Sequence, residues 1–98
     1  MKGQGMKYVW DENKNRENIR KHYIDFNDAV ELFDGNYYES FDIGHSIDED
    51  RFRAIGYMRD IPIVIIYSNP DKNTIRIISA RKAKKHEEKS YWNKLGAS

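Results

Sequence analysis

Two adjacent stretches in the second half of the chain constrain its fold most strongly. Residues 61–67 (Ile-Pro-Ile-Val-Ile-Ile-Tyr) are almost wholly apolar, which is typical of a strand covered on both faces. Residues 75–83 (Ile-Arg-Ile-Ile-Ser-Ala-Arg-Lys-Ala) follow after a short polar break and alternate as a strand does. This second strand carries Arg76 and Arg81 toward a basic helix. We therefore expect the rest of the chain to cover these two strands.

The length of the chain predicts one small domain with a single core. Its 98 residues are 39% hydrophobic and 34% charged, as in an ordinary globular fold. We expect residues 6–95 to form this domain and the Gly-rich residues 1–5 to be flexible. The absence of cysteine excludes disulfides, thiolate catalysis and Cys-bound zinc. With no apolar run long enough for a membrane span and no signal-peptide pattern, we expect a cytoplasmic protein that does not bind membranes.

The net charge of +1 hides a strong segregation of charge along the chain. Residues 1–24 carry +3, residues 25–60 carry −7 and residues 76–98 carry +5. If the two basic ends meet in the fold, they form a patch for a polyanion, while the acidic middle faces elsewhere or meets a basic partner. The alternative is that all of these charges are simply solvated surface.

The first part of the chain predicts a short strand and then a helix. Residues 6–10 alternate as a strand, and Asp11 provides an N-cap for a helix over residues 12–22. The apolar side of this helix is thin, so we expect it to lie lightly on the sheet. Its polar face is either solvated or directed at RNA, and it contains Lys14, Asn18 and Lys21, with His22 beside Asn18.

A second helix has a full amphipathic pattern. Asp25 is its expected N-cap, and Asp34-Gly35-Asn36 is expected to end it. Apolar residues follow the cap at positions i, i+3, i+4 and i+7, which predicts a helix that packs on the core. These residues are Phe26, Ala29, Val30 and Phe33.

The remaining pattern predicts a run of strands and a last helix. Strands are expected over residues 37–41 and 51–58, and a tight turn at Arg59-Asp60 leads into the apolar strand. Turn residues over 68–73 lead into the strand with the two arginines, and a last helix runs from Ala83 to about Leu95. This order predicts an α+β fold, an antiparallel sheet with two N-terminal helices and one C-terminal helix.

Most enzyme signatures are missing from the sequence. It has no phosphate-binding glycine loop, no G-x-S-x-G elbow and no H-E-x-x-H motif. Its three histidines (His22, His45 and His86) are not spaced as a ligand set. The acidic loop 42–50 places His45 between carboxylates, but it lacks the spacing of a preformed metal site. We therefore expect no metal and no other cofactor.

The remaining arginines, lysines, histidines and carboxylates suit cleavage of RNA without a metal. The 2′-hydroxyl attacks its adjacent phosphate, a side chain accepts the proton, and guanidinium groups stabilise the developing charge. Arg76 and Arg81 would then be the electrostatic centre. Because they are five positions apart, they converge only if the strand ends or bends near Ser79-Ala80. The alternative is that both are surface charges beside a buried strand.

Several motifs of this sequence occur together in one known family. The most specific is the block Ile75–Ala83. The others are Val9-Trp10-Asp11, Lys14, Asn18, Lys21-His22, Phe26, Ala29, Phe33-Asp34, His45-Ser46, residues 49–56, Glu88 and Tyr91. In this set the chain resembles the BrnT toxins, the ribonuclease half of the BrnT–BrnA type II toxin–antitoxin module. It departs from that family at Tyr23, where a glycine is expected to close the first helix.

The resemblance implies a RelE-like fold and a metal-independent endoribonuclease that inhibits translation. It also implies neutralisation by a cognate BrnA-type antitoxin, through which alone the pair would contact promoter DNA. The implied catalytic residues are Arg76, Arg81, His22, Lys21 and Glu88. We expect the RNA-binding residues to be Lys14, Arg51, Arg53, Ser79, Lys82, Lys85 and Tyr91. His22 is the first candidate for the general base and Glu88 the second, although His22 could equally cap the end of its helix.

Two other functions fit the same residues. The chain could be a non-catalytic module whose basic face binds nucleic acid or a protein, with salt-dependent RNA binding and no cleavage. It could also be a structural subunit that buries residues 76–95 against a partner helix. In that case changes to Trp92 or Leu95 would impair assembly more than loss of Arg76.

Overall fold

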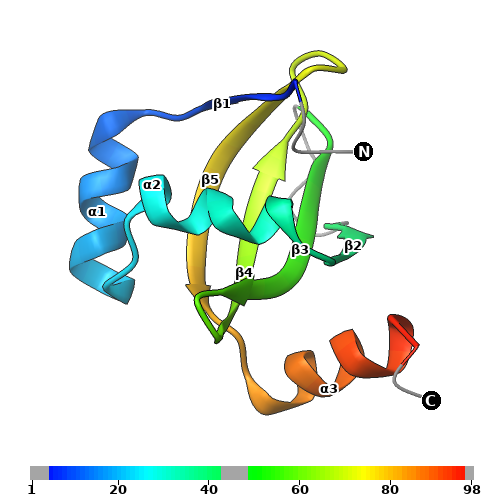
Figure 1. Ribbon diagram of the computed structural model, residues 1–98. Helices are drawn as coiled ribbons and strands as arrows, with labels where there is room; N and C mark the ends of the chain where they lie inside the picture. The colour runs from blue at the N-terminus through cyan, green and yellow to red at the C-terminus, as the bar shows by residue number, and fades with distance from the viewer. Residues whose placement is uncertain (1–4, 43–48, 97–98) are drawn as a thin grey trace.

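The structure is a five-stranded sheet with helices packed on it (Figure 1). This computed structural model describes residues 5–42 and 49–96, so most of the predicted flexible segment 1–5 lies outside the described residues. The strands lie in the order β1-β5-β4-β3-β2, and the predicted α+β class is confirmed. The elements are β1 (Lys7–Val9), α1 (Glu12–His22), α2 (Phe26–Ala29), the 3-10 helix η1 (Val30–Asp34), β2 (Tyr38–Phe41), β3 (Arg51–Met58), β4 (Ile61–Ser68), β5 (Thr74–Lys82) and α3 (Lys85–Lys94).

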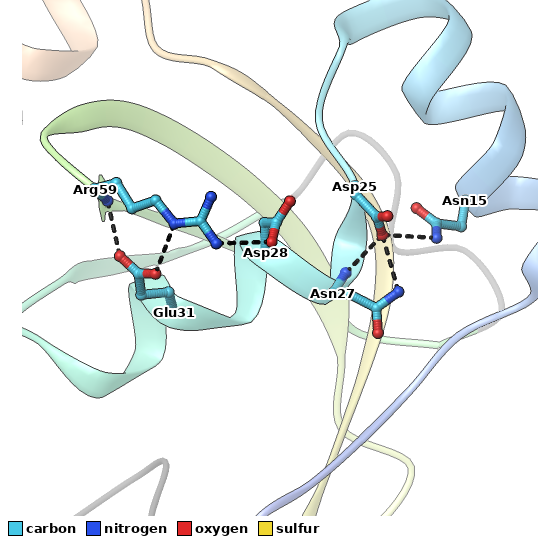
Figure 2. Close-up of polar contacts among 6 residues, drawn as sticks. All are labelled: Asn15, Asp25, Asn27, Asp28, Glu31 and Arg59. Carbon is cyan, nitrogen blue, oxygen red and sulfur yellow. Dashed lines mark hydrogen bonds and ion pairs between the residues drawn. The ribbon is translucent and has the colours of Figure 1, made fainter.

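The hairpin between β3 and β4 sets the register at the centre of the sheet. Arg59 and Asp60 form its two-residue turn with positive φ angles of 50° and 71°. Both residues are in the left-handed conformation of a type I′ turn, so the predicted turn is confirmed. The Arg59 guanidinium also pairs with Asp28 of α2 at 2.8 Å and with Glu31 of η1 at 3.3 Å (Figure 2). These pairs join the tip of the hairpin to the helices above it.

The two faces of the sheet bury different side chains. α2 and η1 cover one face, where the main core includes Phe26, Leu32, Phe33, Ala54, Ile63, Ile65, Tyr67, Ile75, Ile77 and Ala80. On the opposite face, Tyr91 of α3 packs on Ile55 and Val64 in a smaller cluster. Successive residues of a strand point to opposite faces, so Ala54 and Ile55 join different clusters. The apolar strand 61–67 is therefore covered on both sides, as predicted.

One strand pair differs from the predicted antiparallel sheet. β1 pairs with β5 in parallel, with Tyr8 opposite Ile75, whereas the other three pairs are antiparallel. Short turns fix the directions of β3, β4 and β5 relative to one another. Most of the chain separates β1 from β5, so no turn determines the direction in which β1 joins the sheet.

Two of the predicted helices differ in extent. α2 is a single α-helical turn, and η1 continues it as a 3-10 helix that buries Leu32 and Phe33 side by side. Val30, which the 3.6-residue pattern assigns to the core, is only partly buried, and Leu32 takes its place. α3 begins at Lys85, later than predicted, because Ala83 still extends the sheet by donating its N–H to the carbonyl of Pro62.

Buried asparagines hold α1 in place, and its one apolar residue, Ile19, stays exposed. Asn15 donates to the Asp25 side chain at 3.0 Å and accepts the N–H of Phe26 at 2.9 Å, which fixes the start of α2 (Figure 2). Asn18 donates to the carbonyls of Ile24 and Ala80 and accepts the N–H of Ala80. The prediction that Asn18 belongs to the exposed polar face was therefore wrong, because its amide pairs with the edge of β5 in place of a strand.

Tyr23 closes α1 in a conformation that glycine adopts more easily. Its φ of 60° and ψ of 30° are left-handed, its N–H donates to the Ile19 carbonyl, and its side chain is 86% exposed. The strain agrees with the glycine expected at this position from the family resemblance.

We expect Tyr23→Gly to stabilise the protein by about 1 kcal/mol, because a left-handed residue with a Cβ costs roughly 1–2 kcal/mol and glycine adds some freedom to the unfolded chain. Urea denaturation measures the change. Tyr23→Ala, which keeps the Cβ, is the matched control and should bring little gain. Equal stabilities of the Gly and Ala variants would contradict this account.

Candidate functional site

A β-bulge determines where the two arginines of β5 point. Ile66 pairs with Ser79, but the next residue of β4, Tyr67, pairs with Ile77, so Ile78 is an extra residue in β5. Ile77 before the bulge and Ala80 after it both face the main core. The alternation therefore shifts by one residue, and Arg76 and Arg81 share the opposite face. This bulge is the bend that the sequence analysis required near Ser79-Ala80.

Cross-strand pairing brings two more arginines to the same face. Neighbouring strands are about 4.8 Å apart, so side chains two strands apart start about 10 Å from each other. α3 covers the adjoining part of this face over Ile55 and Val64. The arginine-bearing rows across β3, β4 and β5 are Arg51–Ser68–Arg76 and Arg53–Ile66–Ser79.

The face is hollowed where these rows meet the bulge. This hollow, called here the arginine hollow, has a volume of about 370 Å³. Three guanidinium groups in one concave site attract a polyanion. Each guanidinium is planar and can donate two parallel hydrogen bonds to two oxygens of a phosphate. Its lining residues are Asp42, Arg51, Arg53, Ile66, Ile78, Ser79 and Arg81.

A second hollow adjoins the first on the other side of the bulge. This α1 hollow has a volume of about 400 Å³ and shares Ile78 and Ser79 with the arginine hollow. α1 supplies its other wall, because residues seven and eight positions apart lie on one side of a helix. Its remaining lining residues are Asp11, Asn13, Lys14, Glu17, Asn18, Lys21 and His22. The two hollows together join seven predicted site residues: Lys14, Lys21, His22, Arg51, Arg53, Ser79 and Arg81.

Arg81 is held by a carboxylate of α3. Its Nη1 and Nη2 each donate to one oxygen of Glu87 at 2.8 Å, and Nη1 also donates to the Lys82 carbonyl at 3.2 Å. The hydrogen bonds from Arg81 are the main cause that lowers the pKa of Glu87 to about 2. This pairing stabilises the fold fully above pH 4.5, the ordinary pKa of the carboxyl, and the contribution is lost as the pH falls toward 2.

Arg53 and Arg76 on this face have looser carboxylate partners than Arg81. Arg53 lies 4.0 Å from the buried Asp42, and Arg76 lies 3.3 Å from Glu49 with both side chains partly exposed. The exposed pair of Arg76 and Glu49 contributes less than about 1 kcal/mol, so it opens at little cost, and the 4.0 Å separation of Arg53 and Asp42 is too long for a hydrogen bond. Arg76 and Arg53 are therefore easier to redirect to a ligand than Arg81.

Five predicted site residues lie outside the two hollows. Arg76 is on the same face, and Lys82 and Lys85 are exposed where β5 leads into α3. Glu88 accepts a hydrogen bond of 2.6 Å from the Tyr57 hydroxyl. Tyr91 is buried in the smaller cluster, and its hydroxyl donates to the Asn36 carbonyl at 3.2 Å.

Three residues of the site were not singled out from the sequence. Ile78 creates the bulge, Asp42 lines the arginine hollow, and Glu87 binds Arg81. No periodic spacing links Arg81 and Glu87, because Arg81 lies near the end of β5 and Glu87 lies in the first turn of α3. The available signal is the position of Glu87 in the first helical turn, where a carboxylate can accept the N–H of Lys84.

Nothing in the described part of the chain forms a metal site. Residues 5–42 and 49–96 contain no group of three or more side chains placed to bind a metal ion. His45, which the acidic-loop interpretation requires, lies outside the described residues. Within the same ranges, no helix is long and apolar enough to cross a membrane.

Comparison with known families identifies the type of protein. A family model described as the ribonuclease toxin BrnT of a type II toxin–antitoxin system matches residues 10–87. The chain belongs to the BrnT family. The BrnT match includes both walls of the α1 hollow and extends to Glu87, so the candidate site lies within the family region. BrnT is described as a ribonuclease toxin, and RNA is a polyanion that a hollow lined by arginines attracts.

A solved BrnT structure has the same fold. The chain resembles the Brucella abortus ribonuclease toxin BrnT, known at 1.1 Å resolution, with 33% sequence identity and a TM-score of 0.66. The match covers 82% of this chain and 99% of the Brucella protein. No curated protein matches the chain.

Proposed function

We propose that this BrnT-family protein is a metal-independent endoribonuclease whose active site is the pair of hollows at the bulge. The observation that carries this proposal is the convergence of Arg51, Arg53 and Arg81 beside His22 and Lys21, across Ile78 and Ser79. Cations on one side and a titratable imidazole on the other are what intramolecular phosphodiester cleavage requires.

Each group has a distinct task in the proposed reaction. The scissile phosphate binds in the arginine hollow, and the preceding ribose lies toward the α1 hollow. His22 accepts the proton of the 2′-hydroxyl as its oxygen attacks phosphorus, and the bond from phosphorus to the 5′-oxygen breaks. The leaving oxygen takes up a proton, from Lys21 or water. Arg81 stabilises the charge of the phosphorane, with Arg51 and Arg53 beside it.

The proposal extends to the partner and the setting. A BrnA-type antitoxin neutralises the chain, and promoter DNA is contacted through that antitoxin. RNA cleavage in the cytoplasm then inhibits translation until the antitoxin binds. The family description as a type II system supports a protein antitoxin. Co-expression with a BrnA-type protein is expected to restore growth.

We expect the purified chain to cleave single-stranded RNA in excess EDTA and to leave 2′,3′-cyclic phosphate ends. His22→Gln should reduce the rate roughly 100- to 10,000-fold, because a general base contributes that much. Gel analysis of a labelled RNA, with its 2′-deoxy counterpart beside it, measures both effects.

The matched control is His86→Gln, which changes an exposed histidine of α3. It should cleave RNA like the wild type. Activity that disappears in EDTA and returns with Mg²⁺ would overturn the metal-independent mechanism. A His22→Gln variant with normal cleavage and lower stability would assign His22 to the end of α1 as a cap.

A further inference from the structure

The hydrogen bonds of Arg81 leave one particular edge of its guanidinium available. A guanidinium carries five N–H groups in one plane. The two N–H groups of Nη1 donate to Glu87 and to the Lys82 carbonyl. One of the two N–H groups of Nη2 donates to Glu87. Among the described residues, the Nε–H and the second Nη2–H of Arg81 meet no acceptor. These two lie parallel on the same edge, which is the fork that binds two oxygens of one phosphate.

Glu87 is fixed more firmly than a surface partner would be. The residue is 5% exposed, and one oxygen binds both Arg81 and the N–H of Lys84, each at 2.8 Å. The first turn of α3 thus holds the carboxylate, and the carboxylate holds the guanidinium. Arg81 itself lines the arginine hollow. The orientation of its open edge is therefore set before any ligand arrives.

We propose that Glu87 is a positioning residue that presents the Nε–Nη2 edge of Arg81 to a single phosphate of the RNA. The inference rests on the function proposed above and adds a residue absent from the candidate set. The carboxylate occupies one edge of a delocalised cation and leaves the other edge as a donor pair. The rival role, in which Glu87 merely neutralises Arg81, makes the opposite prediction, because removing its charge would then strengthen RNA binding.

Glu87→Gln tests the proposal, since glutamine keeps an oxygen for the Lys84 N–H but loses the charged bidentate pair. We expect kcat for RNA cleavage to fall roughly 10- to 100-fold, as when an outer partner of a functional group is lost. KM should change much less, because the developing charge depends on the orientation of Arg81 more than ground-state binding does. Thermal unfolding should show that the variant is folded at the assay temperature.

A measurement without cleavage separates this inference from the proposed function. The Nε–H resonance of Arg81 is followed by NMR while a 2′-O-methyl RNA oligonucleotide is added. In the wild type, the resonance should shift when the oligonucleotide binds. In Glu87→Gln the guanidinium is no longer held in one orientation, so its motion should average the resonance. If it shifts while cleavage is absent, the positioning role holds and the catalytic proposal fails.

The matched control is Glu31→Gln, which removes the same charge from the ion pair with Arg59 on the other side of the sheet (Figure 2). It should leave kcat and the Arg81 resonance unchanged. The positioning role is overturned if Glu87→Gln cleaves RNA like the wild type or binds the oligonucleotide more tightly. It is also overturned if the Nε–H resonance of wild-type Arg81 does not shift when the oligonucleotide is added.

Discussion

Arg81→Ala is expected to lower the rate of RNA cleavage by roughly 100- to 1,000-fold, the usual effect of removing one donor to the charge of a transition state. Arg81 is the arginine of this face with the most defined geometry, because Glu87 and the Lys82 carbonyl fix three of its N–H groups. Arg53 and Arg76 have longer ion pairs and cannot replace a donor fork held in place. Single-turnover kinetics on a short RNA measure the loss.

The same substitution is also expected to lower the free energy of unfolding. It leaves Glu87 charged and buried with only the N–H of Lys84 as its partner among the contacts described. We expect a loss of roughly 2–3 kcal/mol, below that of a fully buried pair because the Arg81 side chain is about one-third exposed. Rates are therefore compared at a temperature where circular dichroism shows both proteins folded.

Two variants make the Arg81 result specific. Arg81→Lys keeps the charge but cannot form the donor fork, so most of the rate loss should persist. Arg59→Ala removes an arginine with two carboxylate partners from the far hairpin and should leave cleavage unchanged. Full activity in Arg81→Ala, with folding preserved, would remove Arg81 from the mechanism and leave the arginine hollow without its central donor.

Asn18→Ala is expected to cost roughly 3 kcal/mol or more of folding free energy. The substitution removes three hydrogen bonds of 2.8–3.0 Å and leaves the N–H and carbonyl of Ala80 without them in a buried place. Each buried polar group left without a partner costs about 1–3 kcal/mol. Urea denaturation measures the change.

Asn13→Ala is the control for Asn18, since it alters an exposed asparagine on the same helix. Its effect should stay within about 0.5 kcal/mol. Because Asn18 joins α1 to the strand just before Arg81, Asn18→Ala should also separate the two hollows and reduce cleavage. A small stability change with normal activity would show that α1 is held to the sheet by other contacts.

The parts of the fold with local chemical causes were predictable from the sequence. α1 begins and ends at the predicted residues. Its start is fixed because Asp11 accepts hydrogen bonds from the N–H groups of Asn13 and Lys14. The turn at Arg59-Asp60 and the apolar β4 follow from residue type and spacing. The family resemblance rests on motifs spread over the chain, the most specific of them in β5, and it was confirmed by the match over residues 10–87.

The parts that depend on distant contacts were not predictable. The residue type of Ile78 does not predict a bulge. The sequence therefore left open whether Arg76 and Arg81 lie on one face of β5, and the pairing with β4 shows that they do. Asn18 was assigned to the polar face because it recurs at helical spacing with Lys14 and Lys21, and its burial depends on the edge of β5. Glu88 was selected from the family resemblance and stays a prediction, whereas Glu87 was missed because only the packing of α3 shows which carboxylate turns toward Arg81.

The parallel pairing of β1 with β5 has a consequence for how the protein is made. Of the strands in residues 5–42 and 49–96, β1 is synthesised first, and β5, which lies beside it, is synthesised last. The contact of Asn18 in α1 with Ala80 can form only after β5 has been synthesised. Likewise, Arg81 can pair with Glu87 only after the first turn of α3 has been synthesised. The growing chain therefore lacks the paired Arg81 and Glu87 of the candidate site until α3 has been synthesised. On the proposed function, nearby RNA therefore meets a complete site only after β5 and α3 have been made.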